Sequence, residues 1–426
     1  MINNRSLAAF LLMVALPAGI AAQEASVGTR TIADTLELRL RDAVQLGLRQ
    51  NPTYLGVRAG VGVARGELRQ ARTLPFNPVL EVEAPSTQGL GNTYRSTLSQ
   101  ELEIAGQRGL RSQAAEEELR RAEQEAVDSA RVLAANIGRA FLQSLAQQRE
   151  LNLARQTLAL QDRMLEAARI QSREGEISTL EANLVEVERG RAQARVLAAG
   201  RSLVASMSQL RLRIGVGPDQ PVRLVDEPDS LPAWPSVSTD SLVRLALARR
   251  PDLRAATAAA ERARAAARLA RREAIPNVRI GALLEKDEFD RGTQAGIVFG
   301  VPIPVWNRNQ GVTDARRAEL QRAERQRQAV ELQVRADVEV ARNNYLAAAE
   351  QLTALREQVL EPARANQALL ETAYRAGRFN LPTLLLLRNQ LVEAELEYVN
   401  AWLIAHEALI ELEAAIAAPI TSENPQ

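Results

Sequence analysis

Residues 94–104, YRSTLSQELEI, alternate between two kinds of side chain. The mostly apolar set comprises Tyr94, Ser96, Leu98, Gln100, Leu102 and Ile104, and the polar set comprises Arg95, Thr97, Ser99, Glu101 and Glu103. Because successive side chains of a β-strand point to opposite faces, this period of two predicts a strand with one apolar and one charged face. Strands of about 10 residues can cross a membrane when they are tilted.

The same pattern recurs, so the chain is predicted to supply four such strands. Residues 78–88 partly alternate and are separated by Gly and Asn from the strand at 93–104, which predicts a hairpin. Further strands are predicted at about 277–287 and 293–305, on either side of a polar tip. The chain therefore contains two predicted hairpins, one in each half.

The hairpins lie within a longer internal repeat. Residues 43–52, AVQLGLRQNP, are similar to residues 242–251, LVRLALARRP, and each copy continues as an Ala- and Arg-rich helix. Self-similarity of this kind predicts a duplication, with repeats at 23–215 and 239–417. The predicted boundaries are a Pro-rich connector at 216–238 and a C-terminal tail at 418–426.

Each repeat also carries a very long helical pattern. These patterns run from about 106 to 174 and from about 309 to 376, and they end near Gly175 and Gly377. At 1.5 Å per residue, each helix would be roughly 100 Å long, and it needs other helices alongside it, as in a coiled coil. Pro362 is expected to kink the second one. Shorter helices are predicted at about 37–74, 178–215, 239–274 and 381–417.

Four strands require further copies of the chain. The smallest outer-membrane barrels have about eight strands, and an open sheet edge in lipid leaves backbone groups without partners. Two copies would give eight strands around a filled interior, whereas three copies give twelve strands and a lumen. The expected fold is therefore mainly α, with long helical hairpins in a trimeric α-barrel and four strands contributed to a twelve-stranded β-barrel. The polar set of residues 94–104 would line its lumen, and the apolar set would face outer-membrane lipid.

Composition and the N-terminus narrow the class of protein. Residues 1–22 combine Arg5, an apolar run and small residues, which is typical of a signal peptide. The 53 basic and 52 acidic residues leave neither half strongly basic, and Arg-rich runs such as 262–272 lack interleaved aromatic residues, so a nucleic-acid partner is not expected. With no Cys and with His406 as the single His, the usual zinc or copper sites are excluded. No catalytic constellation or phosphate-binding loop is present, so we expect neither an enzyme nor a cofactor.

The junctions between strand and helix carry a family resemblance. Residues 100–108, QELEIAGQR, follow the first hairpin, and residues 301–311, VPIPVWNRNQG, follow the second. Together with the repeat and the tip motif YRAG at 374–377, they resemble the outer membrane efflux protein family, the TolC-like channels, over nearly all of the mature chain. The run at 301–311 is similar to the branch that serves heavy-metal pumps of the cobalt–zinc–cadmium type.

This resemblance implies a homotrimer in the cell outer membrane, with a helical tunnel in the periplasm. A periplasmic adaptor (membrane fusion) protein and an inner-membrane RND pump would dock on the tunnel, and the channel would export solutes passively, with heavy-metal cations as a candidate cargo. The implied adaptor-facing tips are Glu174, Gly175, Glu176, Ile177 and Ser178 in the first repeat, and Arg375, Gly377, Arg378, Phe379 and Asn380 in the second.

One feature departs from the drug-exporting relatives, which carry acidic residues after the second tip. Residues 381–388, LPTLLLLR, contain no acid, so an acidic ring is not expected there. The leucines either close the entrance or pack between helices. Two alternative functions remain: a TolC-like channel for drug efflux or type I protein secretion, and a periplasmic coiled-coil scaffold. The duplicated hairpins favour a channel over a scaffold.

Overall fold

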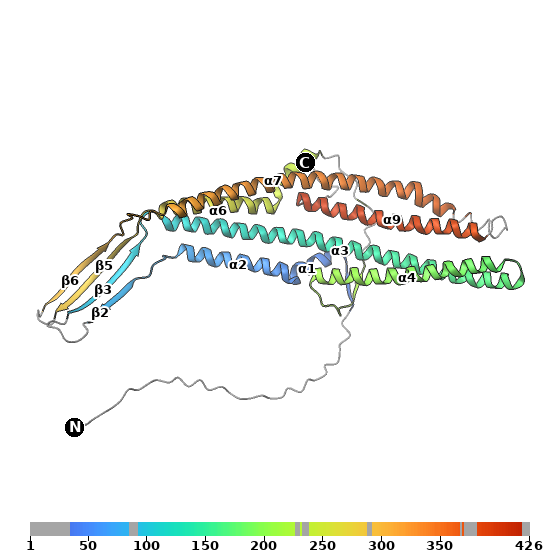
Figure 1. Cartoon of the computed structure of the whole chain (residues 1–426), viewed down its shortest axis with the longest axis horizontal. Helices are drawn as coiled ribbons and strands as arrows, with labels where there is room; N and C mark the ends of the chain where they lie inside the picture. The colour runs from blue at the N-terminus through green and yellow to red at the C-terminus, as the bar shows by residue number, and fades with distance from the viewer. Residues whose placement is uncertain are drawn as a thin grey trace, which may run out of the picture.

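The computed structural model describes residues 35–84, 93–225, 231, 238–287, 292–366, 369 and 381–419. The molecule is elongated, with a four-stranded sheet at one end and long helices running away from it side by side (Figure 1). The order of strands and helices from β1 to α4 recurs from β4 to α9, as an internal duplication predicts. The duplication itself stays an interpretation of the sequence.

The sheet joins the two predicted hairpins. It is antiparallel with the order β2-β3-β5-β6, from β2 (Val79–Glu83), β3 (Thr93–Leu102), β5 (Val278–Asp287) and β6 (Thr293–Gly300). Three strands are shorter than predicted: β2 does not extend to Ala84, β3 ends before 103–104, and β6 ends before 301–305. For β6 the reason is Pro302 and Pro304, which have no amide hydrogen to donate to a ladder.

The helices that precede each hairpin are broken, where the sequence pattern predicted single helices at 37–74 and 239–274. The first is divided into α1 (Leu40–Gln50) and α2 (Pro52–Arg72), and the second into α5 (Thr239–Arg249) and α6 (Pro251–Arg272). At each break the residue before the proline leaves the helical region, as steric conflict with the proline ring favours.

A two-stranded parallel sheet was not predicted. It pairs β1 (Leu36–Leu38) with β4 (Val222–Leu224), so the expected helix begins later and the expected irregular connector contains a strand. Leu38 and Leu224 are buried in a cluster with Phe141 and Trp402, where apolar burial holds β1 and β4 against the long helices.

The first long helix is confirmed over its predicted length, and the second is helical from 310 to 366, beyond which its predicted end near Gly377 lies outside the described residues. These helices are α3 (Gln107–Glu174), followed by α4 (Thr179–Ile214), and α7 (Gln310–Ala354), with α9 (Leu381–Ile416) as the last helix. The residues before α3 and α7, Gly106 and Asn309, both adopt left-handed backbone conformations, with φ of 75° and 60°. The chain thus turns from sheet to helix in the same way in both halves.

Helix α7 loses regular geometry near Pro362. It passes into a π-helical segment, η1 (Leu355–Leu360), and the Glu361 amide donates to the Arg356 carbonyl, five residues back. Pro362 cannot donate a hydrogen bond, and its ring conflicts with the carbonyl four residues earlier, so a π segment just before it relieves that conflict. The irregularity expected at this proline therefore takes the form of a π segment.

Two further clusters hold the helices together. One packs α5, α7 and α9 around Val334, Tyr345 and Leu412, and a smaller one joins α3, α4 and α9 around Leu165 and Leu385. Within the described residues, no helix combines the length and apolar character that a membrane crossing requires.

Candidate functional site

The polar face of the sheet is built by residues that oppose one another across the strands. Arg95 lies opposite Glu83 on one side and Glu285 on the other. Its guanidinium lies 3.5 Å from a carboxylate oxygen of Glu83 and 3.1 Å from one of Glu285. These side chains are exposed, so each pair contributes at most about 1 kcal/mol to stability. Their main effect is to hold the three charged side chains in a row along one face of the sheet.

Further along the same face the surface becomes tighter. Thr97 is half-buried, and Ser99 is buried opposite Gly281. A Cβ at Gly281 would lie 2.7 Å from the Leu98 carbonyl oxygen, so only glycine fits there without a shift. The polar set predicted from residues 94–104 therefore shares one face from Arg95 to Glu101.

The last two members of the polar set lie at the junction with the helices. Glu101 accepts a hydrogen bond of 2.8 Å from the Asn277 amide, which ties β3 to the chain before β5. Glu103 lies beyond the end of β3 and accepts two hydrogen bonds, of 2.7 and 3.0 Å, from Arg111 of α3. Glu103 thus departs from the predicted strand face and orients the start of α3.

The opposite face of the sheet is apolar and exposed. Its exposed side chains, which share this face by register, are Leu80, Val82, Tyr94, Leu98, Leu102, Ile280, Leu284, Ile297 and Phe299. Ile297 is 86% exposed, which is unusual for a large aliphatic side chain at the centre of a strand. A continuous exposed patch of this kind marks a contact with lipid or with another protein surface.

The first helical tip has the geometry of a tight capped turn. Glu174 is the last residue of α3, and Gly175 follows with a φ of 79°, a conformation that glycine adopts without steric cost. The Ser178 hydroxyl accepts a hydrogen bond from the Glu181 amide, and the Glu181 carboxylate accepts one from the Ser178 amide. This reciprocal capping box confirms the predicted turn.

Exposure separates the residues of the first tip. Glu174, Gly175, Glu176 and Ser178 are exposed, whereas Ile177 packs on the cluster that joins α3, α4 and α9. The tip therefore presents polar groups outward from an apolar base. The second predicted tip, with Arg375, Gly377, Arg378, Phe379 and Asn380, lies outside the described residues.

The leucines after the second tip divide in two. Leu384 and Leu385 are buried in the same cluster as Leu165, as expected of residues that pack between helices. Leu386 is 59% exposed and Leu387 is 36% exposed. Leu386 and Leu387 are therefore accessible on the surface of the subunit.

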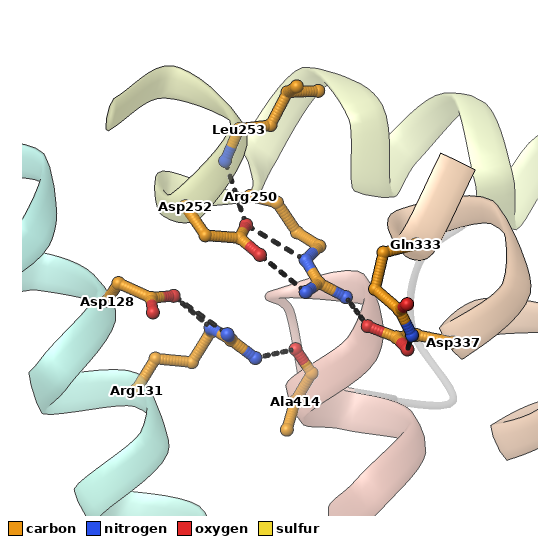
Figure 2. A network of polar contacts seen from close by, with 8 residues as sticks. All are labelled: Asp128, Arg131, Arg250, Asp252, Leu253, Gln333, Asp337 and Ala414. Atoms are coloured by element: carbon orange, nitrogen blue, oxygen red, sulfur yellow. Dashed lines mark hydrogen bonds and ion pairs between the residues drawn. The ribbon is translucent and has the colours of Figure 1, made fainter. Parts of the chain in front are cut away.

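A charged network that sequence reasoning missed lies at the break between α5 and α6 (Figure 2). The Arg250 guanidinium, whose side chain is only 6% exposed, donates to both carboxylate oxygens of Asp252 at 3.0 and 2.6 Å. It also donates to Asp337 of α7 at 2.7 Å, and Gln333 holds the other oxygen of Asp337 at 2.6 Å. Asp252 in turn accepts from the Leu253 amide, which satisfies a donor at the start of α6.

Electrostatics within this network favour the charged forms. Burial alone raises the pKa of the Asp252 carboxyl, but hydrogen bonds and charge from Arg250 outweigh it, and the net pKa lies below the usual value. Burial alone also opposes the charge on Arg250, yet its two carboxylate partners raise its pKa overall. Arg250 and Asp252 are therefore both charged at neutral pH.

A second arginine links α3 to α9 beside this network. Arg131 donates to Asp128 at 2.9 and 2.7 Å and to the Ala414 carbonyl at 2.7 Å (Figure 2). One sequence signal could have revealed the network at Arg250. Arg250 and Asp252, which carry opposite charges, flank Pro251, whereas neutral residues flank Pro52 at the equivalent place in the first repeat.

The single histidine is part of the core. His406 is buried, its Nδ1 lies 2.8 Å from the Trp402 carbonyl oxygen, and burial lowers its pKa. In the described part of the chain, no group of three or more acidic or His side chains is arranged to hold a metal ion.

Comparison with known protein families agrees with this fold. Residues 242–418 match the family model described as "Outer membrane efflux protein", so this part of the chain carries a domain of that family.

Individual relatives agree with this assignment. The chain is 23% identical to the cobalt-zinc-cadmium resistance protein CzcC of Cupriavidus metallidurans, over 85% of this chain and 86% of that protein. It is 27% identical to the pyoverdine export outer membrane protein OpmQ of Pseudomonas putida, over 81% of this chain and 75% of that protein. The structure of the outer membrane protein VceC of Vibrio cholerae shares the fold, with a TM-score of 0.74 at 19% identity, covering 89% of this chain and 96% of that one.

Proposed function

We propose that the chain is the outer-membrane channel subunit of a tripartite RND-type efflux system and that it works as a homotrimer. The observation that carries this proposal is the four-stranded sheet, whose edge strands β2 and β6 each have one unpaired side in the subunit. Backbone groups on such edges cannot stay unpaired in lipid. Pairing β6 of each copy with β2 of the next satisfies both edges, and three copies close twelve strands around a lumen.

The two faces of the sheet support this arrangement. The exposed apolar face, with Ile297 and Phe299, meets lipid, and the polar face, with Arg95, Thr97, Ser99 and Glu101, lines the lumen. Charged groups tolerate a water-filled interior and not the hydrocarbon side of a barrel. Glu103 lies at the end of the sheet next to the helices, where the lumen passes from the sheet to the helical tunnel.

The helical end supports docking to other proteins. The turn between α3 and α4 lies at the end of the molecule farthest from the sheet (Figure 1). We assign adaptor contact to its exposed residues Glu174, Gly175, Glu176 and Ser178, with Ile177 as their apolar base, and to the second tip with Arg375, Gly377, Arg378, Phe379 and Asn380. The helices then form the periplasmic tunnel, and a separate inner-membrane pump supplies the energy.

For the cargo we propose heavy-metal cations, the substrates that the name of the cobalt-zinc-cadmium relative indicates for that protein. The siderophore exporter among the relatives makes a small organic solute the competing candidate. A passive tunnel needs few residues specific for the solute, so the cargo is decided by the pump.

The first experiment is to purify the chain from outer-membrane fractions and to measure its mass in detergent by light scattering. We expect the mass of three chains. A water-soluble monomer or dimer in the periplasm would contradict the channel and would favour the coiled-coil scaffold.

The second experiment tests the tip and the cargo. In a strain that lacks the gene, the wild-type chain should restore resistance to cobalt, zinc and cadmium, and Glu176→Arg should weaken both resistance and crosslinking to the adaptor. The matched control is Glu339→Arg, an exposed acid on α7 away from the tip. Restored drug resistance without metal resistance would reassign the cargo, and equal crosslinking by both variants would remove the tip assignment.

A further inference from the structure

The apolar face of the sheet does not stop where its hydrogen bonds stop. Beyond the end of β6, Val301 and Ile303 keep the two-residue spacing of Ile297 and Phe299 along the sequence, and Val305 and Trp306 follow a tight turn at Pro304. Ile303 is 82% exposed and Trp306 is 88% exposed, whereas Trp402 is 2% exposed. A fully exposed tryptophan next to exposed aliphatic residues leaves a large apolar area in water, so this segment has a partner outside the subunit.

The segment is held in place by its own hydrogen bonds. Pro302 and Pro304 restrict the backbone, and the Val305 amide donates to the Ile303 carbonyl at 2.9 Å. Gln310 accepts from the Arg308 amide at 2.8 Å and donates to the Trp306 carbonyl at 3.3 Å. The backbone that carries Trp306 is therefore fixed against the start of α7.

All four junctions between sheet and helices carry exposed apolar side chains at this level. Leu74 lies between α2 and β2, Ile104 between β3 and α3, and Ile275 between α6 and β5, and these three are 56%, 61% and 40% exposed. With Ile303, Val305 and Trp306 they form what we call the apolar collar.

Arginines accompany the collar. Helices α2 and α6 end in Arg72 and in Arg271 and Arg272, Arg108 lies in the first turn of α3, and Arg308 lies two residues before α7. The first turns of α3 and α7 contain no acid, although the positive end of a helix dipole favours acids there. Among the described residues, no ion pair is formed by Arg108, Arg271, Arg272 or Arg308, and Arg108 uses its Nε to donate to the Arg72 carbonyl at 2.8 Å. Exposed Glu273 follows Arg272, so the four arginines leave the junction with an excess of positive charge suited to anionic groups.

We infer that the apolar collar and its arginines form the lipid boundary of the subunit at the periplasmic leaflet. Trp306 lies at the level of the headgroups, and Arg108, Arg271, Arg272 and Arg308 bind lipid phosphate. Side chains leave a sheet perpendicular to it, so the face of Phe299 meets lipid and not the neighbour paired along the edge, and the collar directly adjoins the end of that face. Tryptophan and arginine are the side chains that favour this interface. The inference rests on the proposed insertion of the sheet in a membrane.

The test uses the full chain in vesicles of phosphatidylcholine and phosphatidylglycerol, with bromine on the acyl chains either near the headgroup or near the methyl end. The emission component that is missing from Trp306→Phe belongs to Trp306. We expect headgroup-proximal bromine to quench it about twofold, and deep bromine to quench it less, as for an interfacial tryptophan. The matched control is Phe299→Trp in the Trp306→Phe background, which places the reporter on the sheet itself.

The two reporters distinguish a failure of the collar from a failure of membrane insertion. If the reporter at 299 is quenched and Trp306 is not, the sheet is inserted but the collar does not contact lipid, and blue-shifted unquenched emission from Trp306 would assign it to a protein contact. If neither reporter is quenched, both the contact of the collar with lipid and the insertion of the sheet are contradicted. Both substitutions replace exposed side chains, so folding is preserved.

A second measurement addresses the arginines. Phenylglyoxal modification, read by mass spectrometry, should fall about threefold at Arg108, Arg271, Arg272 and Arg308 in phosphatidylglycerol vesicles relative to nonionic detergent, because phosphate occupies their donors. Arg58, an exposed arginine on α2, is the control and should be unchanged. Equal modification at the collar in vesicles and in detergent would overturn phosphate binding.

Discussion

Two breaks occupy equivalent places in the two halves of the molecule and are stabilised by different chemistry. Asn51 and Arg250 each precede the proline that begins a helix, with almost the same backbone angles, and both are buried. Asn51 accepts from the Tyr54 amide at 3.0 Å and donates to the Arg213 carbonyl at 2.9 Å. Arg250 instead binds two carboxylates.

The difference reflects what each break packs against. In the first half, the break meets the end of α4, which offers backbone carbonyls, and a neutral amide satisfies them. In the second half, it meets α7, which offers the Asp337 carboxylate, and only a cation balances that charge. The two breaks thus have the same backbone conformation, and the polar side chain at each one matches the groups on the helix it packs against.

The largest expected effect comes from Arg250→Ala. Removing the guanidinium leaves Asp252 and Asp337 without their partner in a mostly buried place, which should cost about 3 kcal/mol of unfolding free energy. The midpoint of thermal unfolding in detergent, followed by circular dichroism, measures it. The control is Arg249→Ala, one residue earlier and exposed. Similar losses in the two variants would show that the network is not what stabilises this break.

Next in size is Gly215→Ala, which tests the surface that the first break packs on. Gly215 has a φ of 77°, and a Cβ there would lie 2.7 Å from the Gln50 carbonyl oxygen. We expect a loss of about 2 kcal/mol. Gly200 lies in the middle of α4, and a Cβ there would have no neighbouring atom within 4 Å. Gly200→Ala should therefore stabilise the protein by about 0.5 kcal/mol. Thermal melts that give both variants the same sign would contradict this account.

A smaller loss is expected for Asn51→Ala. The variant loses the cap of α2 and the bond to Arg213, together about 1 to 2 kcal/mol. The exposed neighbour variant Gln50→Ala should stay within about 0.5 kcal/mol of wild type in the same melts. If Asn51→Ala lowered the unfolding free energy as much as Arg250→Ala, the view that the charged break depends more strongly on its polar contacts would be contradicted.

The smallest effect is a dependence on pH that belongs to the second break alone. Because the folded-state pKa of Asp252 is depressed, its contribution is present above the unfolded value of about 4 and is lost as pH falls through the folded value. Wild type should therefore lose more stability than Asp252→Asn on acidification below about pH 4. Parallel melting curves for the two proteins across that range would be the contrary result.

Much of the fold could be predicted because its signals are local. The period of two over residues 94–104 gave β3, and the helical period gave α3, since each pattern depends on neighbours along the chain. The cap at Ser178 was likewise local. The lumen and adaptor roles of the predicted residues stay predictions.

The missed features depend on residues distant in sequence. Arg250 and Asp337 are 87 residues apart, and the β1–β4 pair brings Glu37 and Arg223 together across 186 residues. The breaks were missed for another reason. Proline is accepted in the first turn of a helix, so a helical pattern that contains Pro52 or Pro251 reads equally well as one helix or as two.

The π segment before Pro362 also changes how residues count along the helix. The buried stripe of α7 follows Val334, Val338, Ala341, Tyr345 and Ala348, at spacings of three and four. Continued unchanged, the stripe would reach Val359, but Val359 is 39% exposed and Leu360 is 2% exposed. The wide turn absorbs one residue, so the apolar stripe resumes in phase one position late. The π segment thus lets the helix hold one residue more than a regular turn while the same face stays inward.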